Sequence, residues 1–121
     1  MGMTKHTEYA WAAGFWDGEG CTYRHLNQAK SVTWNRGATP GMSLGQSGSR
    51  EGLDRFQTAL SGLGKVYGPY PQPEGPGRKP RYRWELVGRW RCQQALAYLW
   101  SYLSSEKKDQ AKRVFQECRK D

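Results

Sequence analysis

Residues 11–20, WAAGFWDGEG, constrain the fold of this chain more strongly than any other stretch. They lead from an apolar, aromatic segment directly into two carboxylates, Asp17 and Glu19, each followed by a glycine. The pattern predicts a helix over residues 5–16. Because the C-terminal end of a helix carries partial negative charge, two acidic side chains at this point are unfavourable unless something compensates them.

One face of this helix, which Thr4 or Thr7 can cap, consists of small side chains. Larger side chains point largely elsewhere, toward an expected core. A face this small allows the backbone of another helix to approach closely. At a period of 3.6 residues its members are Ala10, Ala13, Gly14 and Asp17.

Two interpretations of the acidic turn remain open from these residues alone. A tight, oxygen-rich and negatively charged turn suits a hard cation such as Mg²⁺, with phosphates or a second chain completing the shell. Alternatively, Asp-Gly-Glu-Gly is an ordinary helix-to-strand turn built from turn-forming residues.

The rest of the chain predicts two strands, a helix, a hairpin and two further helices. The first strand pair is only weakly apolar, whereas the helices show clear hydrophobic spacing. The predicted strands cover 21–29 and 37–46, the helix 49–64, the hairpin arms 65–70 and 80–88, and the final helices 90–103 and 107–120.

The second hairpin arm alternates between apolar and charged side chains. Tyr82 and Trp84 interleave with Arg81, Arg83 and Glu85, which predicts a sheet with one apolar face and one polar, mostly basic face. We expect most of the six tryptophans to pack in a core built from large rings and leucines.

Composition narrows the class of partner. A chain of 121 residues predicts one domain, residues 1–121. The net charge of +8 favours a polyanionic partner, although a merely soluble basic domain is the simpler alternative.

Three cysteines without a Cys-x-x-Cys pair indicate neither a zinc site nor a disulfide framework. With no secretory segment or membrane-length apolar run, we expect an intracellular protein without membrane contact.

Residues 12–20, AAGFWDGEG, resemble the motif of the LAGLIDADG homing endonucleases. Glu19 replaces the final aspartate, and Ala12 and Trp16 replace aliphatic residues. The resemblance continues in order through MSLGQSGSREGLDRFQTALSGLGKVYG, YRWELVG and ALAYLWSYLSSEKKDQA. It implies an α+β fold of order αββαββα with a DNA-binding antiparallel sheet, and a single motif copy implies a homodimer.

The resemblance also implies an activity: site-specific cleavage of double-stranded DNA, of the intron- or intein-homing type, at a partly palindromic target. Water activated by Mg²⁺, for which Mn²⁺ can substitute, would attack the phosphodiester. Glu19 would bind the metal together with the Gly18 carbonyl, and Gln46 would order water. Lys107 would activate water or stabilise charge, with Lys108 as a competitor for that role.

The same resemblance assigns two surfaces. The small-residue stripe would pack against its copy in a second subunit around a two-fold axis, with Asp17 mainly shaping the helix end. The strands would enter the major groove. The base-facing residues would be Tyr23, His25, Asn27, Thr39, Gly41 and Ser43, with Arg81 and Arg83 as guanine contacts and Lys65 and Arg78 as phosphate contacts. This register sends Arg24 toward the helices, where an unpaired arginine is unfavourable unless an edge position frees it.

A second class of function uses the same fold without cleavage. The chain would then be a catalytically inactive DNA-binding regulator or an RNA-splicing maturase. The acid, glutamine and lysine at positions 19, 46 and 107 favour the nuclease. In either case the expected location is the cytoplasm of a bacterium or phage-infected cell, or an organelle.

Overall fold

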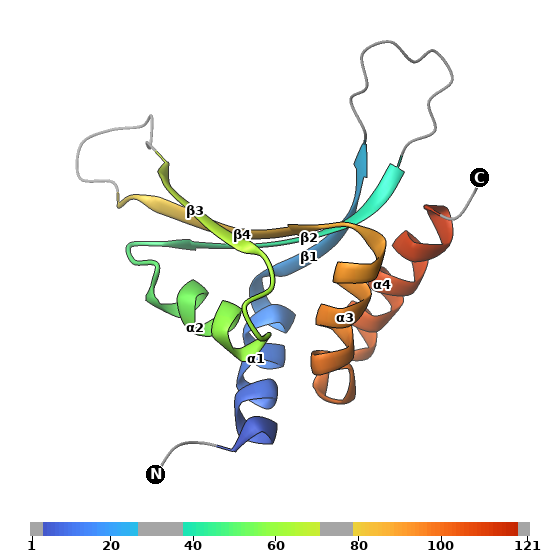
Figure 1. Ribbon diagram of the computed structural model, residues 1–121, viewed down its shortest axis with the longest axis horizontal. Helices are drawn as coiled ribbons and strands as arrows, with labels where there is room; N and C mark the ends of the chain where they lie inside the picture. Colours follow the sequence, from blue (N-terminus) through green and yellow to red (C-terminus); the bar gives the residue numbers. More distant parts are fainter. Residues whose placement is uncertain (1–3, 27–37, 71–78, 119–121) are drawn as a thin grey trace.

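The computed structural model describes residues 4–26, 38–70 and 79–118. Within these ranges the elements follow the predicted order of helix, two strands, helix, two strands and two helices (Figure 1). They are α1 (Lys5–Glu19), β1 (Gly20–Leu26), β2 (Ala38–Ser47), α2 (Glu51–Ala59), β3 (Lys65–Tyr70), β4 (Arg81–Val87), α3 (Arg89–Leu99), the short 3₁₀ helix η1 (Trp100–Tyr102) and α4 (Ser105–Glu117). The α+β fold class is therefore confirmed.

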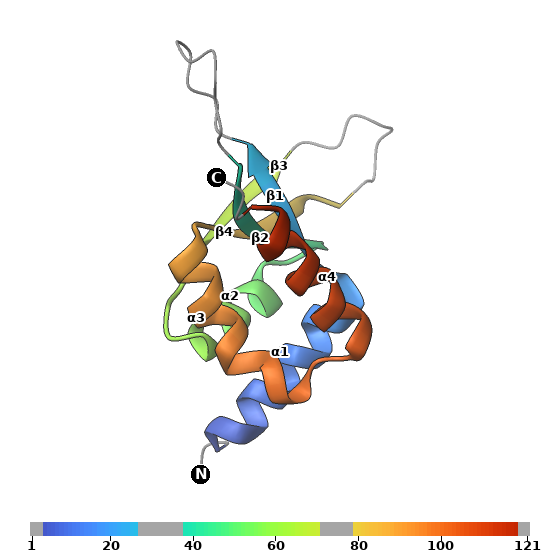
Figure 2. The same ribbon diagram turned by 90° about the vertical axis from the view of Figure 1, so that its right-hand side faces the viewer.

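The strands form one antiparallel sheet in the order β1-β2-β4-β3. The helices gather on one face of this sheet, and no element of the described ranges covers the other (Figures 1 and 2). We call the uncovered side the open face. Since β1 lies at an edge, its outer backbone groups need partners from outside the sheet.

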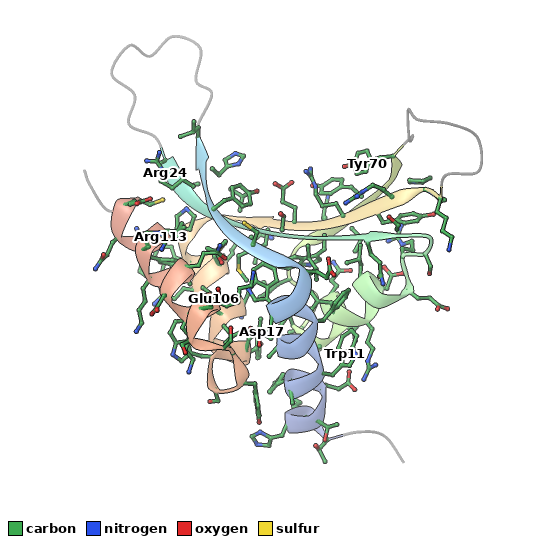
Figure 3. All side chains as sticks on the ribbon, turned by 180° about the vertical axis from the view of Figure 1, so that it is seen from behind. Trp11, Asp17, Arg24, Tyr70, Glu106 and Arg113 are labelled. Carbon is green, nitrogen blue, oxygen red and sulfur yellow. The ribbon has the colours of Figure 1, made fainter. Side chains whose placement is uncertain are left out.

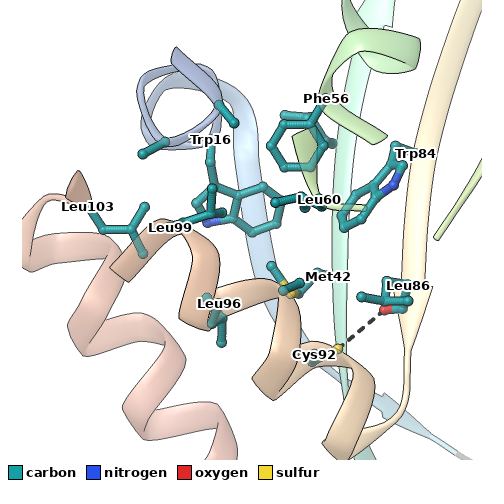
Figure 4. Packing of buried hydrophobic residues seen from close by; sticks show 14 of the residues in the cluster. Trp16, Met42, Phe56, Leu60, Trp84, Leu86, Cys92, Leu96, Leu99 and Leu103 are labelled. Atoms are coloured by element: carbon teal, nitrogen blue, oxygen red, sulfur yellow. Dashed lines mark hydrogen bonds between the residues drawn. The ribbon is translucent and has the colours of Figure 1, made fainter. Parts of the chain in front are cut away.

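The core between sheet and helices is built on three rings (Figure 4). Trp16 of α1 stacks on Phe56 of α2 with centroids 6.0 Å apart, and Trp84 of β4 meets Phe56 edge-on at 4.8 Å. All three are fully buried, and the Trp84 indole donates to the Leu63 carbonyl at 2.9 Å. The aromatic core expected from the sequence is confirmed.

Two glycines make room for the indoles. A Cβ at Gly20 would lie 2.1 Å from the Trp16 ring, and a Cβ at Gly64 would lie 2.4 Å from the Trp84 nitrogen. Trp90 is an exception to the expected packing of the tryptophans in the core, because its side chain is 75% exposed at the start of α3.

Helix α1 is longer than the sequence predicts. It begins after the Thr4 cap, whose hydroxyl accepts a hydrogen bond from the Thr7 amide, and it continues to Glu19 instead of stopping at residue 16. Its C-terminal end meets the sheet (Figure 1). Both acids of the motif consequently lie in the last helical turn, beside the start of β1.

The last two helices differ from prediction at their junction. Helix α3 ends at Leu99 and is followed by η1, and α4 begins at Ser105, two residues before the predicted start. The reason is the cap: the Ser104 hydroxyl accepts a hydrogen bond from the Lys107 amide at 3.2 Å.

None of the helices in the described ranges combines the length and the apolar character needed to cross a membrane.

Candidate DNA-cleavage site and sheet surface

The two acids of the motif have different environments. The half-buried Asp17 accepts hydrogen bonds from the Ser104 amide, at 3.1 and 3.3 Å to its two oxygens, and so joins α1 to the start of α4 (Figure 3). Glu19 and Gly18 are exposed. Asp17 is therefore engaged within its own chain, and its predicted place at a subunit interface stays a prediction.

A hollow lies where β2 extends past the beginning of β1. The first β1 residue, Gly20, pairs with Leu44, so residues 45–47 of β2 have only β4 as a partner. The hollow has a volume of about 220 Å³. Its lining consists of Phe15, Glu19, Gly45, Gln46, Ser47 and Arg81.

Gln46 lies beside the acid as predicted, and its amide oxygen is buried with no hydrogen-bond partner among the described residues. Gly52 of α2 leaves space for this amide, since a Cβ there would lie 2.6 Å from the oxygen. A buried polar atom without a partner is unfavourable unless a ligand or water satisfies it. The hollow therefore brings an exposed carboxylate and the Gln46 side chain together, while the amide oxygen itself lies against Gly52.

These oxygen donors fit a hard divalent cation such as Mg²⁺. Glu19 supplies an exposed carboxylate, and the end of α1 adds backbone carbonyls with partial negative charge. No group of three His, Cys, Asp or Glu side chains suitable for a metal occurs within the described ranges.

The structure distinguishes between the two lysines that compete at the start of α4. The Lys107 ammonium donates to the Gly20 carbonyl at 2.6 Å, directly after Glu19, whereas the Lys108 ammonium lies over the Trp100 ring at 5.7 Å. Lys107 thus compensates the negative end of α1. One turn later, Gln110 accepts from the Thr22 amide at 3.1 Å, so both side chains satisfy outer backbone groups of the edge strand.

On the open face, the predicted alternation of the strands is confirmed. Thr22, Met42, Leu44, Trp84 and Leu86 are buried against the helices. The side chains between them therefore point to the open face. In the described ranges these include Tyr23, His25, Thr39, Ser43, Lys65, Arg81 and Arg83; Asn27 and Arg78 lie outside those ranges.

Arg24 points toward the helix side, as the register requires. An unpaired arginine buried there would be unfavourable, but the edge position of β1 leaves this side chain partly in solvent. Its guanidinium lies 3.7 Å from the Glu117 carboxylate of α4, with both side chains 49% exposed (Figure 3). The arginine therefore remains solvated and paired.

Sequence reasoning missed Glu85, which is held at the centre of the open face. The Tyr23 hydroxyl donates to one oxygen of its carboxylate, and the Arg83 guanidinium donates to the other at 3.2 Å. The alternation of apolar and charged side chains around Trp84 could have identified Glu85, because it places Glu85 on the same face as Arg83.

The outer face of α1 is narrower than the predicted stripe. Ala10, Gly14 and Gly18 are exposed, and a Cβ built at Gly14 or Gly18 would meet no atom within 4 Å beyond its chain neighbours and the backbone of its own helix. Ala13 is fully buried in its own subunit. The assignment of Ala13 to a subunit interface is therefore wrong, because residues three apart on a helix diverge enough for Ala13 to face the core while Ala10 faces outward.

A larger hollow, of about 630 Å³, lies between α3 and α4 and shares no lining residue with the Glu19 hollow. Its lining includes Trp90, Trp100 and Phe115. It contains no carboxylate, so size alone does not identify the candidate cleavage site.

Among the comparisons with known proteins, the match to solved structures supports the fold. No protein-family model matches the chain, and no curated protein matches it. Homing endonuclease I-CvuI, solved in complex with a DNA target in the presence of magnesium with the DNA uncleaved, is 25% identical, with a TM-score of 0.72 over 96% of this chain and 68% of that chain.

Two further solved structures agree. Homing endonuclease I-TnaI is 18% identical, with a TM-score of 0.71 over 98% of this chain and 73% of that chain. The archaeal intron-encoded homing endonuclease I-Vdi141I, complexed with DNA, is 20% identical, with a TM-score of 0.66 over 96% of this chain and 67% of that chain. With the motif residues at the end of α1 and an open antiparallel sheet beside them, the chain has the LAGLIDADG homing endonuclease fold that its sequence resembles.

Proposed function

We propose that this protein is a homodimeric, divalent-metal-dependent endonuclease that cleaves double-stranded DNA at a specific, partly palindromic site of the intron- or intein-homing type. The observation that carries the proposal is the hollow beside the open sheet face, which brings together Glu19, Gln46 and Arg81. The structural neighbours solved with DNA support the same class of substrate.

The role proposed for each residue of the site follows from its contacts. Glu19 and the Gly18 carbonyl hold a divalent cation, which when bound supplies Lewis-acid chemistry at the scissile phosphate. Gln46, which lines the hollow with Glu19, orients water through its side-chain amide. Lys107 holds the end of α1 in place through the Gly20 carbonyl, and its ammonium adds positive charge beside the acid.

One chain supplies too few ligands for a closed metal site, and this supports a dimer. Two subunits that meet through the exposed Ala10–Gly14–Gly18 face of α1 bring their Glu19 residues together. A third hollow, of about 530 Å³, lies along this face and is lined by Ala10, Trp11, Gly14, Phe15, Gln46 and Gly52. It shares the lining residues Phe15 and Gln46 with the Glu19 hollow, which supports a site completed at the subunit interface.

The test is selection of cleaved sites from a randomised double-stranded DNA library. With Mg²⁺ or Mn²⁺ present, we expect one partly palindromic sequence to be enriched, and with EDTA we expect no cleavage. Specific binding without cleavage under any metal condition would instead favour the DNA-binding regulator on the same fold.

Arg81 is expected to contribute to cleavage more than to affinity. Its guanidinium lines the Glu19 hollow and lies 3.0 Å from the position that a Cβ at Gly45 would occupy, so it crosses β2 toward the acid. A cation there stabilises charge that develops on the phosphate. We expect Arg81→Ala to lower the single-turnover cleavage rate by about 10²-fold, with a much smaller change in binding.

The matched control is Arg91→Ala, which removes the same charge from an exposed position on α3. It should leave the cleavage rate nearly unchanged. Equal losses of affinity and cleavage in the Arg81 variant would show that this arginine only binds the DNA backbone.

A further inference from the structure

Glu85 is an acidic residue on the open face, where the other charged strand residues of the described ranges are Lys65, Arg81 and Arg83. Its side chain is 21% exposed, and it lies on the open face between Arg83 on its own strand and Lys65 across from it on β3. Because DNA presents a dense row of negative phosphates, an acid on this face weakens general DNA binding. Its presence there requires a compensating role.

Both oxygens of this carboxylate are engaged. Tyr23, two strands away on β1, donates its hydroxyl proton to one oxygen, and the Arg83 guanidinium donates to the other at 3.2 Å. Burial and the nearby carboxylate raise the pKa of the Tyr23 hydroxyl well above its usual value, so it remains a donor at neutral pH.

The tyrosine reaches Glu85 because the strand between them carries a glycine. A Cβ at Gly41 would lie 2.7 Å from the Tyr23 ring, so the ring crosses β2 directly over this residue. The arrangement therefore depends on Tyr23, Gly41 and Glu85, one from each of three adjacent strands.

Arg83 is held from two sides. One of its terminal nitrogens bonds Glu85, and its guanidinium carbon lies 5.8 Å from the centre of the Tyr70 ring. A guanidinium has five N–H donors in a planar fork, so one bond to Glu85 leaves other donors for a ligand. An arginine that is already oriented loses less conformational entropy on binding than a free one.

We infer that Glu85 is a positioning residue for base recognition: with Tyr23 it orients Arg83 to contact a guanine edge in the major groove, which makes binding depend on the base pair. Arg83 makes the base contact, and Glu85 acts through Arg83. The inference rests on the proposed function, because it requires specific recognition of double-stranded DNA by the open face.

The test uses the selected target and duplexes carrying every single base-pair change in one half-site, with the same change repeated in the other half-site. Binding is measured with Ca²⁺ in place of Mg²⁺ to limit cleavage. We expect Glu85→Gln to reduce discrimination at one position of the half-site by about tenfold, and Arg83→Ala to reduce discrimination at the same position. Affinity for non-target DNA should rise with Glu85→Gln, since a negative charge is removed.

Tyr23→Phe is the second variant, because it keeps the ring over Gly41 and removes only the hydroxyl. It should weaken discrimination between base pairs at that same position. If Glu85→Gln does not fold, Tyr23→Phe alone tests the inference. The matched control is Glu106→Gln, an equal charge change at an exposed site on α4, which should leave base preference unchanged (Figure 3).

The outcomes separate this inference from the proposed function. If the unmodified protein shows no preference among duplexes, the proposed function fails and the inference fails with it. If the protein is specific but the folded Glu85 and Tyr23 variants keep its base preference at every position, only the positioning role is overturned. A change of affinity that is equal for all duplexes would also overturn it, since that indicates a general charge effect.

Discussion

Replacing Glu19 with glutamine should abolish DNA cleavage and leave DNA affinity nearly intact. The side chain is exposed at the end of α1 and lines the hollow with Gln46, so the amide can occupy the same space without disturbing the core. A neutral amide is a much poorer ligand for Mg²⁺ than a carboxylate. Metal assistance at a phosphate contributes several kcal/mol, so we expect cleavage to fall by about 10³-fold or more.

The measurements are single-turnover cleavage, binding of the uncut target, and titration of Mg²⁺ into the protein–DNA complex. Affinity should be equal or slightly higher, because one negative charge per subunit is removed from the DNA-facing side. The Mg²⁺ titration should show weaker binding. The matched control is Glu51→Gln, at an exposed position in the first turn of α2, which should cut normally. Cleavage at the original rate by Glu19→Gln would remove this residue from the proposed site.

Replacing Gly14 with leucine should separate the proposed dimer without unfolding the subunit. A Cβ at this position has no atom within 4 Å, and leucine is a better helix former than glycine by roughly 1 kcal/mol. In a two-fold interface the added bulk is present twice, and forced overpacking costs about 1–3 kcal/mol per site. We therefore expect the dimer dissociation constant to rise by about 10²-fold or more while subunit stability stays equal or increases.

Sedimentation checks the oligomeric state, and thermal unfolding checks the subunit. The matched control is Ala97→Leu, which adds bulk at an exposed position of α3 and should leave the association state unchanged. A Gly14 variant that sediments as the same dimer would contradict the helix-pair interface. Loss of the dimer should also remove cleavage, since the site is proposed to need two subunits.

Local patterns predict those features whose cause is local. The alternation around Trp84 correctly separates the apolar and basic faces of the sheet, because a strand sends successive side chains to opposite sides. The acidic turn after the small-residue helix correctly locates the place where α1 meets the sheet. The lysine of the Lys-x-x-Gln-Ala segment also reaches the end of α1.

The errors have a common physical cause. Ala13 and Ala10 are both small, and composition cannot tell which of them faces the core; packing against Trp16 and its neighbours decides it. By contrast, Lys107, which the resemblance favours over Lys108, is the lysine that reaches the Gly20 carbonyl, and the Ser104 cap marks where its helix begins. Helix α1 extends beyond its predicted end, and Asp17 in the added turn bonds Ser104, far along the chain.

The element order, the two-faced sheet and the acid at the end of α1 could be predicted from the amino-acid sequence, since these features depend on periodicity and on residues close together in the chain. The folded arrangement was needed to show that Arg81 shares a hollow with Glu19, and that Tyr23 reaches Glu85 across Gly41. These arrangements join residues from different strands and helices. Strand register and the space left by a missing side chain create such contacts, and both arise only when the chain is folded.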